Sequence, residues 1–447
     1  MVPYNENKLK NIRVSRLFII TGIISLILAL IFGLIAAAQF AFPGFISELP
    51  FFKSRPLHVS LAVAWIFSVG IGAVYNYLEE KQMLKYKWLA LIHWLIFVTT
   101  GIVIIVSFFN GIFGGREYWE FPPIYSLPIL FSWILFGVVY FSSVRFISNW
   151  PVYLWMWGTG IVVFFFTFLE ANSWIIDYFS NSVTRELTIQ WKSYGSLVGS
   201  WNMFVYGSGL FIMEKICGDE NYSKSKIAFV LYFVGLTNLF FNWAHHVYLV
   251  PSSEWIGLIA YLISMTELFI IGRIIWKWKA TLNSALKYKH KQPYLFLLSS
   301  DLWIFLNLAL AIIISVPAIN LYTHGTHITV AHAMGSTIGI NTTILFAFLL
   351  FVFNTKKSLW INVGLYLVNI SLLIFWCALI FAGIIKSGAQ LEGVSFQVMM
   401  QSVLPYLKYF MYSGLTLALG LLILLFHIIF EFLLDFPENI LKQKDVQ

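Results

Sequence analysis

The sequence contains few charged residues and only two cysteines. Charged side chains make up 11% of the 447 residues, whereas hydrophobic side chains make up 60%. Soluble globular domains carry about a quarter of their residues as charged side chains, so the composition excludes that class. The cysteines, Cys217 and Cys377, lie far apart in the sequence and predict no disulfide framework.

Several motifs of soluble enzymes are also absent. The sequence has no P-loop, no G-x-G-x-x-G dinucleotide fingerprint and no H-E-x-x-H zinc motif. The net charge is +8, but the lysines and arginines lie at the ends of apolar runs. This placement is typical of a membrane protein and excludes nucleic acid as a partner.

Long apolar runs occupy most of the chain. A run of at least ~18 residues is long enough to cross a bilayer as a helix. We therefore predict an all-α membrane protein, a twelve-transmembrane-helix bundle that forms a single polytopic domain over residues 1–447. The predicted spans are 16–40, 57–78, 86–108, 126–147, 153–174, 190–214, 226–249, 255–277, 297–320, 327–353, 360–385 and 407–433.

The distribution of lysine and arginine predicts the orientation of the bundle. Most of these cations fall on one side, among them those near Lys8, Lys81, Lys215, Lys289 and Lys442, whereas the other side has only scattered cations. Because positive loops stay in the cytoplasm, we predict cytoplasmic termini for a chain in a cell inner membrane.

Four histidines share one predicted depth in the membrane. His58 begins the second span, His245 and His246 end the seventh, and His332 lies about one turn inside the tenth. All four therefore lie toward the outer side. Histidine is costly inside a membrane and is a common ligand of haem iron and other metals. Histidines that merely tolerate the interface are the alternative, and the adjacent pair favours metal binding.

The tenth span carries a second candidate ligand. Positions 332 and 334 lie ~200° apart around a helix, so a helix with a haem ligand at each position lies between two haems. Position 334 is a methionine. Methionine is an axial haem ligand in some proteins, although in an apolar helix it is more often a packing residue.

These segments resemble a known family, the haem-copper oxidase superfamily. Within it they resemble most closely the large, catalytic, haem-bearing subunit of cytochrome-c-dependent nitric oxide reductase. The segment Asn320-Leu-Tyr-Thr-His-Gly-Thr-His-Ile-Thr-Val-Ala-His332 resembles the family's Y-T-H-G-T-x-x-T-x-A-H signature. Arg55-Pro-Leu-His58 resembles its R-x-x-H, and Gly115-Arg-Glu-Tyr-Trp-Glu120 resembles its G-R-E-x-x-E. The resemblance covers nearly the whole chain.

The resemblance implies two haems. His58 would hold a low-spin haem b, with Met334 standing where the family has that haem's second histidine; a five-coordinate haem or none are the alternatives there. His332 would hold a high-spin haem b. Arg55 would meet a haem propionate.

It further implies an outer region rich in polar side chains. We expect His324 and His327 to contact haem propionates at the outer mouth of the site. Glu117 and Glu120 correspond to residues that the family uses for calcium and for the haem propionates.

A non-haem metal is less well supported. His245 and His246 correspond to ligands of a non-haem iron or copper ion, but Tyr194 and Val198 stand where the family's sixth helix has a histidine and a glutamate. Tyr194 is either a substitute ligand and catalytic residue or an interfacial tyrosine. Glu267 corresponds to the family's membrane glutamate on the eighth helix, and we predict that it is catalytic.

The expected function is a membrane oxidoreductase that reduces NO to N2O, or carries out related NO or O2 chemistry, with electrons from a cytochrome c. The missing sixth-helix ligands leave open a non-catalytic haem-bearing electron-transfer, sensor or assembly subunit. A transporter is a third reading, without an inverted repeat to support it. Because the chain lacks Cys-x-x-Cys-His, haem c would come from a small membrane-anchored partner.

Overall fold

The computed structural model describes residues 12–144, 150–251, 253–263, 265, 289–355 and 357–442, with side chains up to residue 431. The regular elements of this part of the chain are all helices. The long ones are α2 (Val14–Ala41), α3 (Phe51–Glu80), α4 (Lys87–Phe109), α5 (Ser126–Ser143), α6 (Val152–Ala171), α8 (Val183–Cys217), α9 (Lys226–Phe241), α12 (Lys291–Ile314), α15 (Thr343–Val352), α16 (Leu359–Leu391) and α17 (Phe396–Lys442).

Shorter elements join or extend them. These are η1 (Pro123–Tyr125), η2 (Ser173–Ile175), α7 (Asp177–Ser180), η3 (Tyr222–Lys224), η4 (Asn242–Val247), α13 (Pro317–Thr323), α14 (His327–Met334) and η5 (Gly335–Thr342). The last is a π-helix that continues α14 into α15. Such segments are rare and are frequently found at functional sites.

Ten helical segments of the described residues are long and apolar enough to cross a membrane. The predicted count of twelve is therefore not confirmed. Two predicted spans are not among the ten. The span 190–214 lies within the continuous helix α8, and only Glu254–Ile263 of the span 255–277 is described as a helix.

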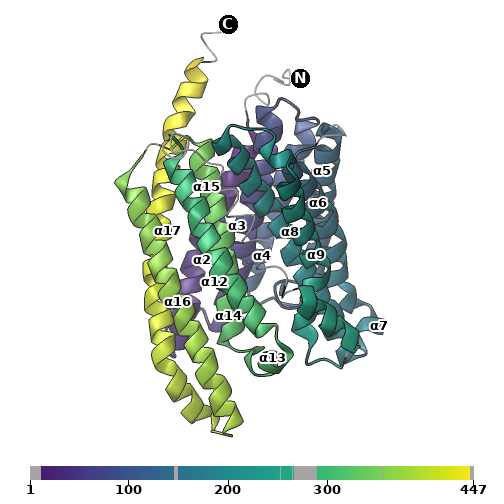
Figure 1. Ribbon diagram of the computed structural model, residues 1–447, viewed down its shortest axis with the longest axis vertical. Coiled ribbons are helices and arrows are strands. Elements are labelled where there is room, and N and C mark those ends of the chain that lie inside the picture. The colour runs from purple at the N-terminus through teal and green to yellow at the C-terminus, as the bar shows by residue number, and fades with distance from the viewer. Residues whose placement is uncertain are drawn as a thin grey trace.

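The helices run side by side as one bundle (Figure 1). Both termini emerge at the same end, whereas α7, α13 and the turn between α16 and α17 lie at the other end. We refer to the end that bears the termini as the inner end and to the opposite end as the outer end, following the orientation predicted from the lysine-rich loops.

Helix α8 lies at the centre of the part of the bundle that holds the histidines. It contacts α3, α6, α9, α15 and η4. Because protein surrounds it, α8 carries polar side chains that pair with neighbouring helices. Ser196 donates to the Leu239 carbonyl at 3.0 Å, and Ser200 donates to the Gly160 carbonyl at 2.9 Å. Because α8 contains these polar residues, it is less apolar than the ten helical segments that could cross a membrane.

A carboxylate of α3 caps the first helix. Arg13, which precedes α2, makes no capping hydrogen bond. Instead, Glu79 accepts from the Val14 backbone N–H at 2.7 Å and from the Ser15 hydroxyl at 2.5 Å. The first N–H groups of a helix lack partners within the helix, and a negative charge there also suits the helix dipole. Glu79 therefore attaches the inner end of α2 to that of α3.

We expect Glu79→Ala to lower the free energy of unfolding by about 1–2 kcal/mol, because it leaves the start of α2 uncapped. The measurement is chemical or thermal unfolding of the purified protein in detergent. The neighbouring Glu80→Ala is the matched control. Glu80 is 48% exposed and pairs with Lys215, and such surface pairs contribute about 0–1 kcal/mol. Equal effects of the two substitutions would contradict the capping role.

Candidate haem and metal site

His58 is oriented by a hydrogen bond from α3 to α2. Its Nδ1 lies 2.8 Å from the Ala29 carbonyl oxygen. A carbonyl only accepts, so Nδ1 carries the proton and Nε2 has a free lone pair. A metal-bound histidine typically has this arrangement, in which the second nitrogen fixes the tautomer and the ring orientation. His58 therefore fits the axial haem ligand predicted for it.

A glycine makes this geometry accessible. A Cβ on Gly33 would lie 2.6 Å from His58 Nδ1 and 2.8 Å from Cε1. Both distances are shorter than a van der Waals contact. The absence of a side chain at Gly33, one helical turn after Ala29, thus lets the imidazole approach the backbone of α2.

Arg55 lies one turn before His58 and joins two carboxylates of the outer loop. It donates to Glu117 at 2.8 Å and to Glu120 at 2.6 Å. Burial raises the pKa of Glu120 above its ordinary value, although the Arg55 charge opposes this. Burial also raises the pKa of Tyr118 in the same loop to about 12. Glu117 and Glu120 thus bind the Arg55 guanidinium. Among the described residues of this loop, no group of three or more His, Cys, Asp or Glu side chains could hold a calcium ion.

His332 lies on α14 and lines a cavity of about 220 Å³ whose surface is mostly apolar. This cavity lies between α8, α9, α12 and the segment from α14 to α15. The His332 ring lies beside the Asn307 backbone. The polar side chains that line this cavity include Asn202, Asn238, Ser300, Asp301 and Asn307.

The tenth span is tied to the helix that carries His58. Thr342, at the end of η5, accepts a hydrogen bond from Trp65 Nε1 of α3 at 3.1 Å. Its own hydroxyl donates to the Thr337 carbonyl five residues back, at 2.8 Å. Asn341 donates to Asn202 of α8 at 3.2 Å. The π-helix thus connects α3 with α8.

The histidine pair meets a third histidine. The ring centroids of His245 and His246 lie 4.2 Å apart, and the His324 ring lies 5.8 Å from that of His246. Trp191 of α8 stacks on His246 with centroids 4.9 Å apart. Burial lowers the pKa of His324, which favours the neutral form that binds metals. His324 was predicted to contact haem propionates, and its position beside His246 was not predicted.

Two glycines of α8 allow this approach. A Cβ on Gly195 would lie 2.4 Å from Trp243 Cβ, and one on Gly199 would lie 2.8 Å from Leu239 Cβ. The helix therefore packs directly against α9 and the turn that bears the histidine pair.

These side chains do not complete a metal site. Among the described residues, no group of three or more His, Cys, Asp or Glu side chains is arranged to hold a metal ion. Tyr194 accepts a hydrogen bond from Gln190 at 3.2 Å, and its ring lies edge-on to Tyr118 of the outer loop, with centroids 5.3 Å apart. The described contacts of Tyr194 are therefore with its own helix and with the outer loop.

Three further residues, Met334, His327 and Glu267, were predicted to belong to the site. Met334 is half-buried and packs against the main hydrophobic core. His327 begins α14, and its Nδ1 is buried without a partner among the described residues. Glu267 falls outside the described residues.

A carboxylate that lines the cavity was not predicted as a site residue. Asp301 lies on α12 and is 3% exposed. A single carboxylate inside the apolar run 297–320 was the available signal, since such residues in membrane spans are generally functional.

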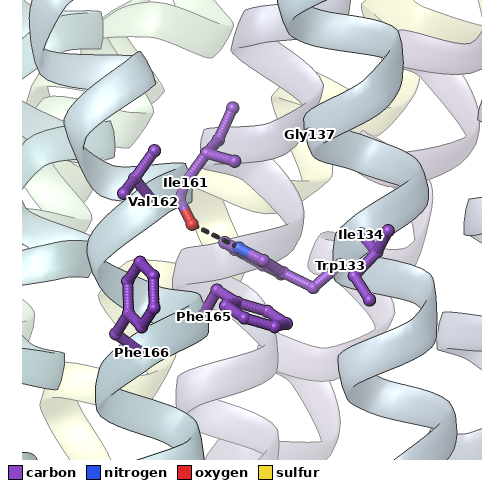
Figure 2. Close-up of a pocket in the computed structure, with 7 residues that line it drawn as sticks. All are labelled: Trp133, Ile134, Gly137, Ile161, Val162, Phe165 and Phe166. Carbon is purple, nitrogen blue, oxygen red and sulfur yellow. Dashed lines mark hydrogen bonds between the residues drawn. The ribbon is translucent and has the colours of Figure 1, made fainter.

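A second hollow lies between α5 and α6. It has a volume of about 190 Å³, and Figure 2 shows its aromatic and aliphatic lining with the Trp133 indole donating to the Ile161 carbonyl at 2.8 Å. Because that hydrogen bond satisfies the indole, the hollow offers no group for chemistry.

The chain matches known proteins along most of its length. The family model of cytochrome c and quinol oxidase polypeptide I matches residues 13–429. A nitric oxide reductase subunit from Stutzerimonas stutzeri is 21% identical over 357 residues, which are 74% of this chain and 73% of that protein. A heme-copper terminal oxidase dimer solved by cryo-EM has a TM-score of 0.70 at 14% identity, covering 94% of this chain and 84% of that chain.

The chain therefore belongs to the cytochrome c and quinol oxidase polypeptide I family. It is a multi-span membrane haem oxidoreductase of the haem-copper oxidase type.

We expect Gly33→Ala to weaken haem binding roughly 10- to 100-fold, as loss of a partner that orients a metal ligand does. The added methyl group would displace the His58 ring from the Ala29 carbonyl. Haem content and reduced-minus-oxidised absorption spectra measure the effect. Gly101→Ala is the control, because a Cβ there meets nothing within 4 Å. Unchanged spectra in both variants would argue against His58 as a ligand.

Proposed function

We propose that this protein reduces nitric oxide to nitrous oxide. The observation that carries the proposal is the His58 imidazole, held with Nε2 free, together with the His332 cavity in a chain similar to a nitric oxide reductase subunit. We further propose twelve membrane crossings, cytoplasmic termini and a location in a bacterial inner membrane. On this arrangement the haem region lies toward the outer side.

The residues support two haem sites. We propose that His58 holds a low-spin haem b, with Met334 as its second ligand, and that His332 holds a high-spin haem b. Bound haem would supply iron that accepts and passes on single electrons. Arg55, His324 and His327, with Glu117 and Glu120, would form the polar outer border toward the haem propionates.

The protein's own contribution is orientation and the exclusion of water. The bond from His58 to Ala29 fixes one imidazole before any haem binds, which lowers the cost of ordering it. The cavity beside His332 lies within a bundle whose outer surface is apolar, so a small uncharged gas can reach it through the lipid. Reduction of two NO molecules to N2O and water consumes two electrons and two protons. We propose reduced cytochrome c, from a small membrane-anchored subunit, as the electron source.

The incomplete metal site favours a second candidate function. Because no three-ligand group occurs among the described residues, we assign no step to a non-haem metal, and Tyr194 and Glu267 remain proposals as catalytic residues. A haem-bearing electron-transfer, sensor or assembly subunit would need His58 but not a second metal. Both candidate functions predict bound haem, but only nitric oxide reduction predicts that the protein consumes a gas.

We expect the purified protein to form one N2O for every two NO consumed when supplied with reduced cytochrome c. Gas chromatography of the headspace, with an NO electrode, measures both. His332→Ala should lower the rate roughly a thousandfold or more, because it removes the ligand of the proposed reacting haem. His290→Ala, which alters a histidine at the start of α12, should have no effect.

Two outcomes would overturn this function. Haem-loaded protein that consumes neither NO nor O2 would support the non-catalytic subunit. Rapid O2 consumption without N2O formation would assign the chain to the oxidases.

A further inference from the structure

The tenth predicted span changes its helical register directly after its candidate ligands. Residues Gly335–Thr342 form the π-helix η5, which begins at the residue after Met334. In a π-helix each backbone hydrogen bond spans five residues, whereas in an α-helix it spans four. The turns before η5, which carry His332, are therefore offset by about one residue, or about 100°, from a continuous α-helix.

One side chain stabilises this longer register from within. Thr342 donates its hydroxyl proton to the Thr337 carbonyl, five residues back, at 2.8 Å. A threonine inside an α-helix usually donates to the carbonyl three or four residues back, as Thr343 does to Gly339 at 2.5 Å. The Thr342 side chain thus repeats the spacing of the π-helical backbone.

Helix α3 determines which way that hydroxyl points. Trp65 Nε1 donates to Thr342 Oγ1 at 3.1 Å. An indole nitrogen only donates, so Thr342 accepts at Oγ1 and its single hydroxyl proton goes to Thr337. Both side chains are buried, with Trp65 1% and Thr342 4% exposed. Consecutive hydrogen bonds in a buried chain strengthen one another.

Trp65 is itself held in place by two neighbouring helices. Its ring packs on Phe346 of α15, with centroids 5.7 Å apart, and a Cβ on Gly22 of α2 would lie 3.4 Å from its carbonyl oxygen. Trp65 follows His58 by seven residues, so the two lie on the same face of α3, about two turns apart. Helix α3 therefore carries one candidate haem ligand and also contacts the register-setting turn of the helix that carries the other.

We propose that Trp65 and Thr342 are positioning residues for His332. Their hydrogen-bond chain keeps η5 in the π register, and this register turns His332 toward the cavity between α8, α9 and α12. If η5 became α-helical while α15 stayed in place, His332 would move to the position of Ala331, and Ala333 would move to that of His332. The inference rests on the proposed function, which makes His332 a haem ligand.

The first test measures the content and the absorption spectrum of the high-spin haem, without any gas. Thr342→Val removes the hydroxyl and leaves the Trp65 indole unpaired, so we expect roughly fivefold or more loss of this haem. Trp65→Phe should act in the same direction, and Thr342→Ser, which keeps the hydroxyl, should restore the spectrum. If Thr342→Val yields no folded protein, Trp65→Phe carries the same prediction.

Two matched controls remove equally buried groups outside this chain. Thr343→Val is the same substitution one residue later, where the hydroxyl donates to carbonyls of an α-helical spacing. Trp133→Phe removes an indole that donates to the Ile161 carbonyl at 2.8 Å. We expect both controls to keep the haem spectrum of the unchanged protein.

The second test moves the histidine by one position. In an otherwise unchanged chain, His332→Ala combined with Ala333→His should bind no high-spin haem. In the Thr342→Val background the same pair should regain that haem, because position 333 then takes the place of 332. A substitution that merely loosened the packing would not produce this rescue.

The third test requires no haem. Backbone hydrogen exchange of the segment Gly335–Thr342, followed by mass spectrometry, reports how often its hydrogen bonds open. Thr342→Val and Trp65→Phe should speed this exchange roughly fivefold or more, whereas Thr343→Val should leave it unchanged.

Three results would overturn the proposal. They are an unchanged spectrum and exchange rate in Thr342→Val and Trp65→Phe, equal haem loss in the two controls, and no regained haem when the histidine is moved in the Thr342→Val background. A protein that makes no N2O but loses its high-spin haem in Thr342→Val would refute the proposed reaction and support the positioning role.

Discussion

In a membrane, a polar group that lacks water needs a partner inside the protein. This constraint determines where the functional side chains of the chain lie. Glu79 of α3 accepts hydrogen bonds from the first residues of α2. The His58 ring, also on α3, donates a hydrogen bond to the Ala29 carbonyl of α2. Asn341 of the π-helix donates to Asn202 of α8. Each pair stabilises a contact between helices and at the same time holds a polar side chain in one orientation.

The same constraint divides the bundle by depth. Toward the outer end, imidazoles gather with Arg55 and the carboxylates of the outer loop, and water can satisfy their remaining groups. Toward the inner end, Glu79 holds the start of α2, and Asp301 lines the cavity that also contains His332. The segment from α14 through η5 to α15 joins the two regions, because it carries His332 and also contacts α3 and α8.

The histidine pair His245–His246 is not part of a group of three or more His, Cys, Asp or Glu side chains that could hold a metal among the described residues. His245, His246 and His324 come close together, yet Tyr194 faces the outer loop and the described residues provide no third well-placed ligand. A haem protein with an incomplete neighbouring site can still transfer electrons.

Amino-acid order alone determined the class of protein and most of the helices, and it predicts one shared depth for His58, His245, His246 and His332. These features follow from the length of apolar runs and from the lysines and arginines beside them, which are local properties of the chain. Only the tertiary structure decided that Gly33 faces His58, that His324 lies beside His246 and that Asp301 lines a cavity with His332. Those contacts join segments far apart in sequence, and they depend on how each helix is rotated about its axis. Rotation follows from the packing of neighbouring helices, which an apolar run of nearly uniform composition does not reveal.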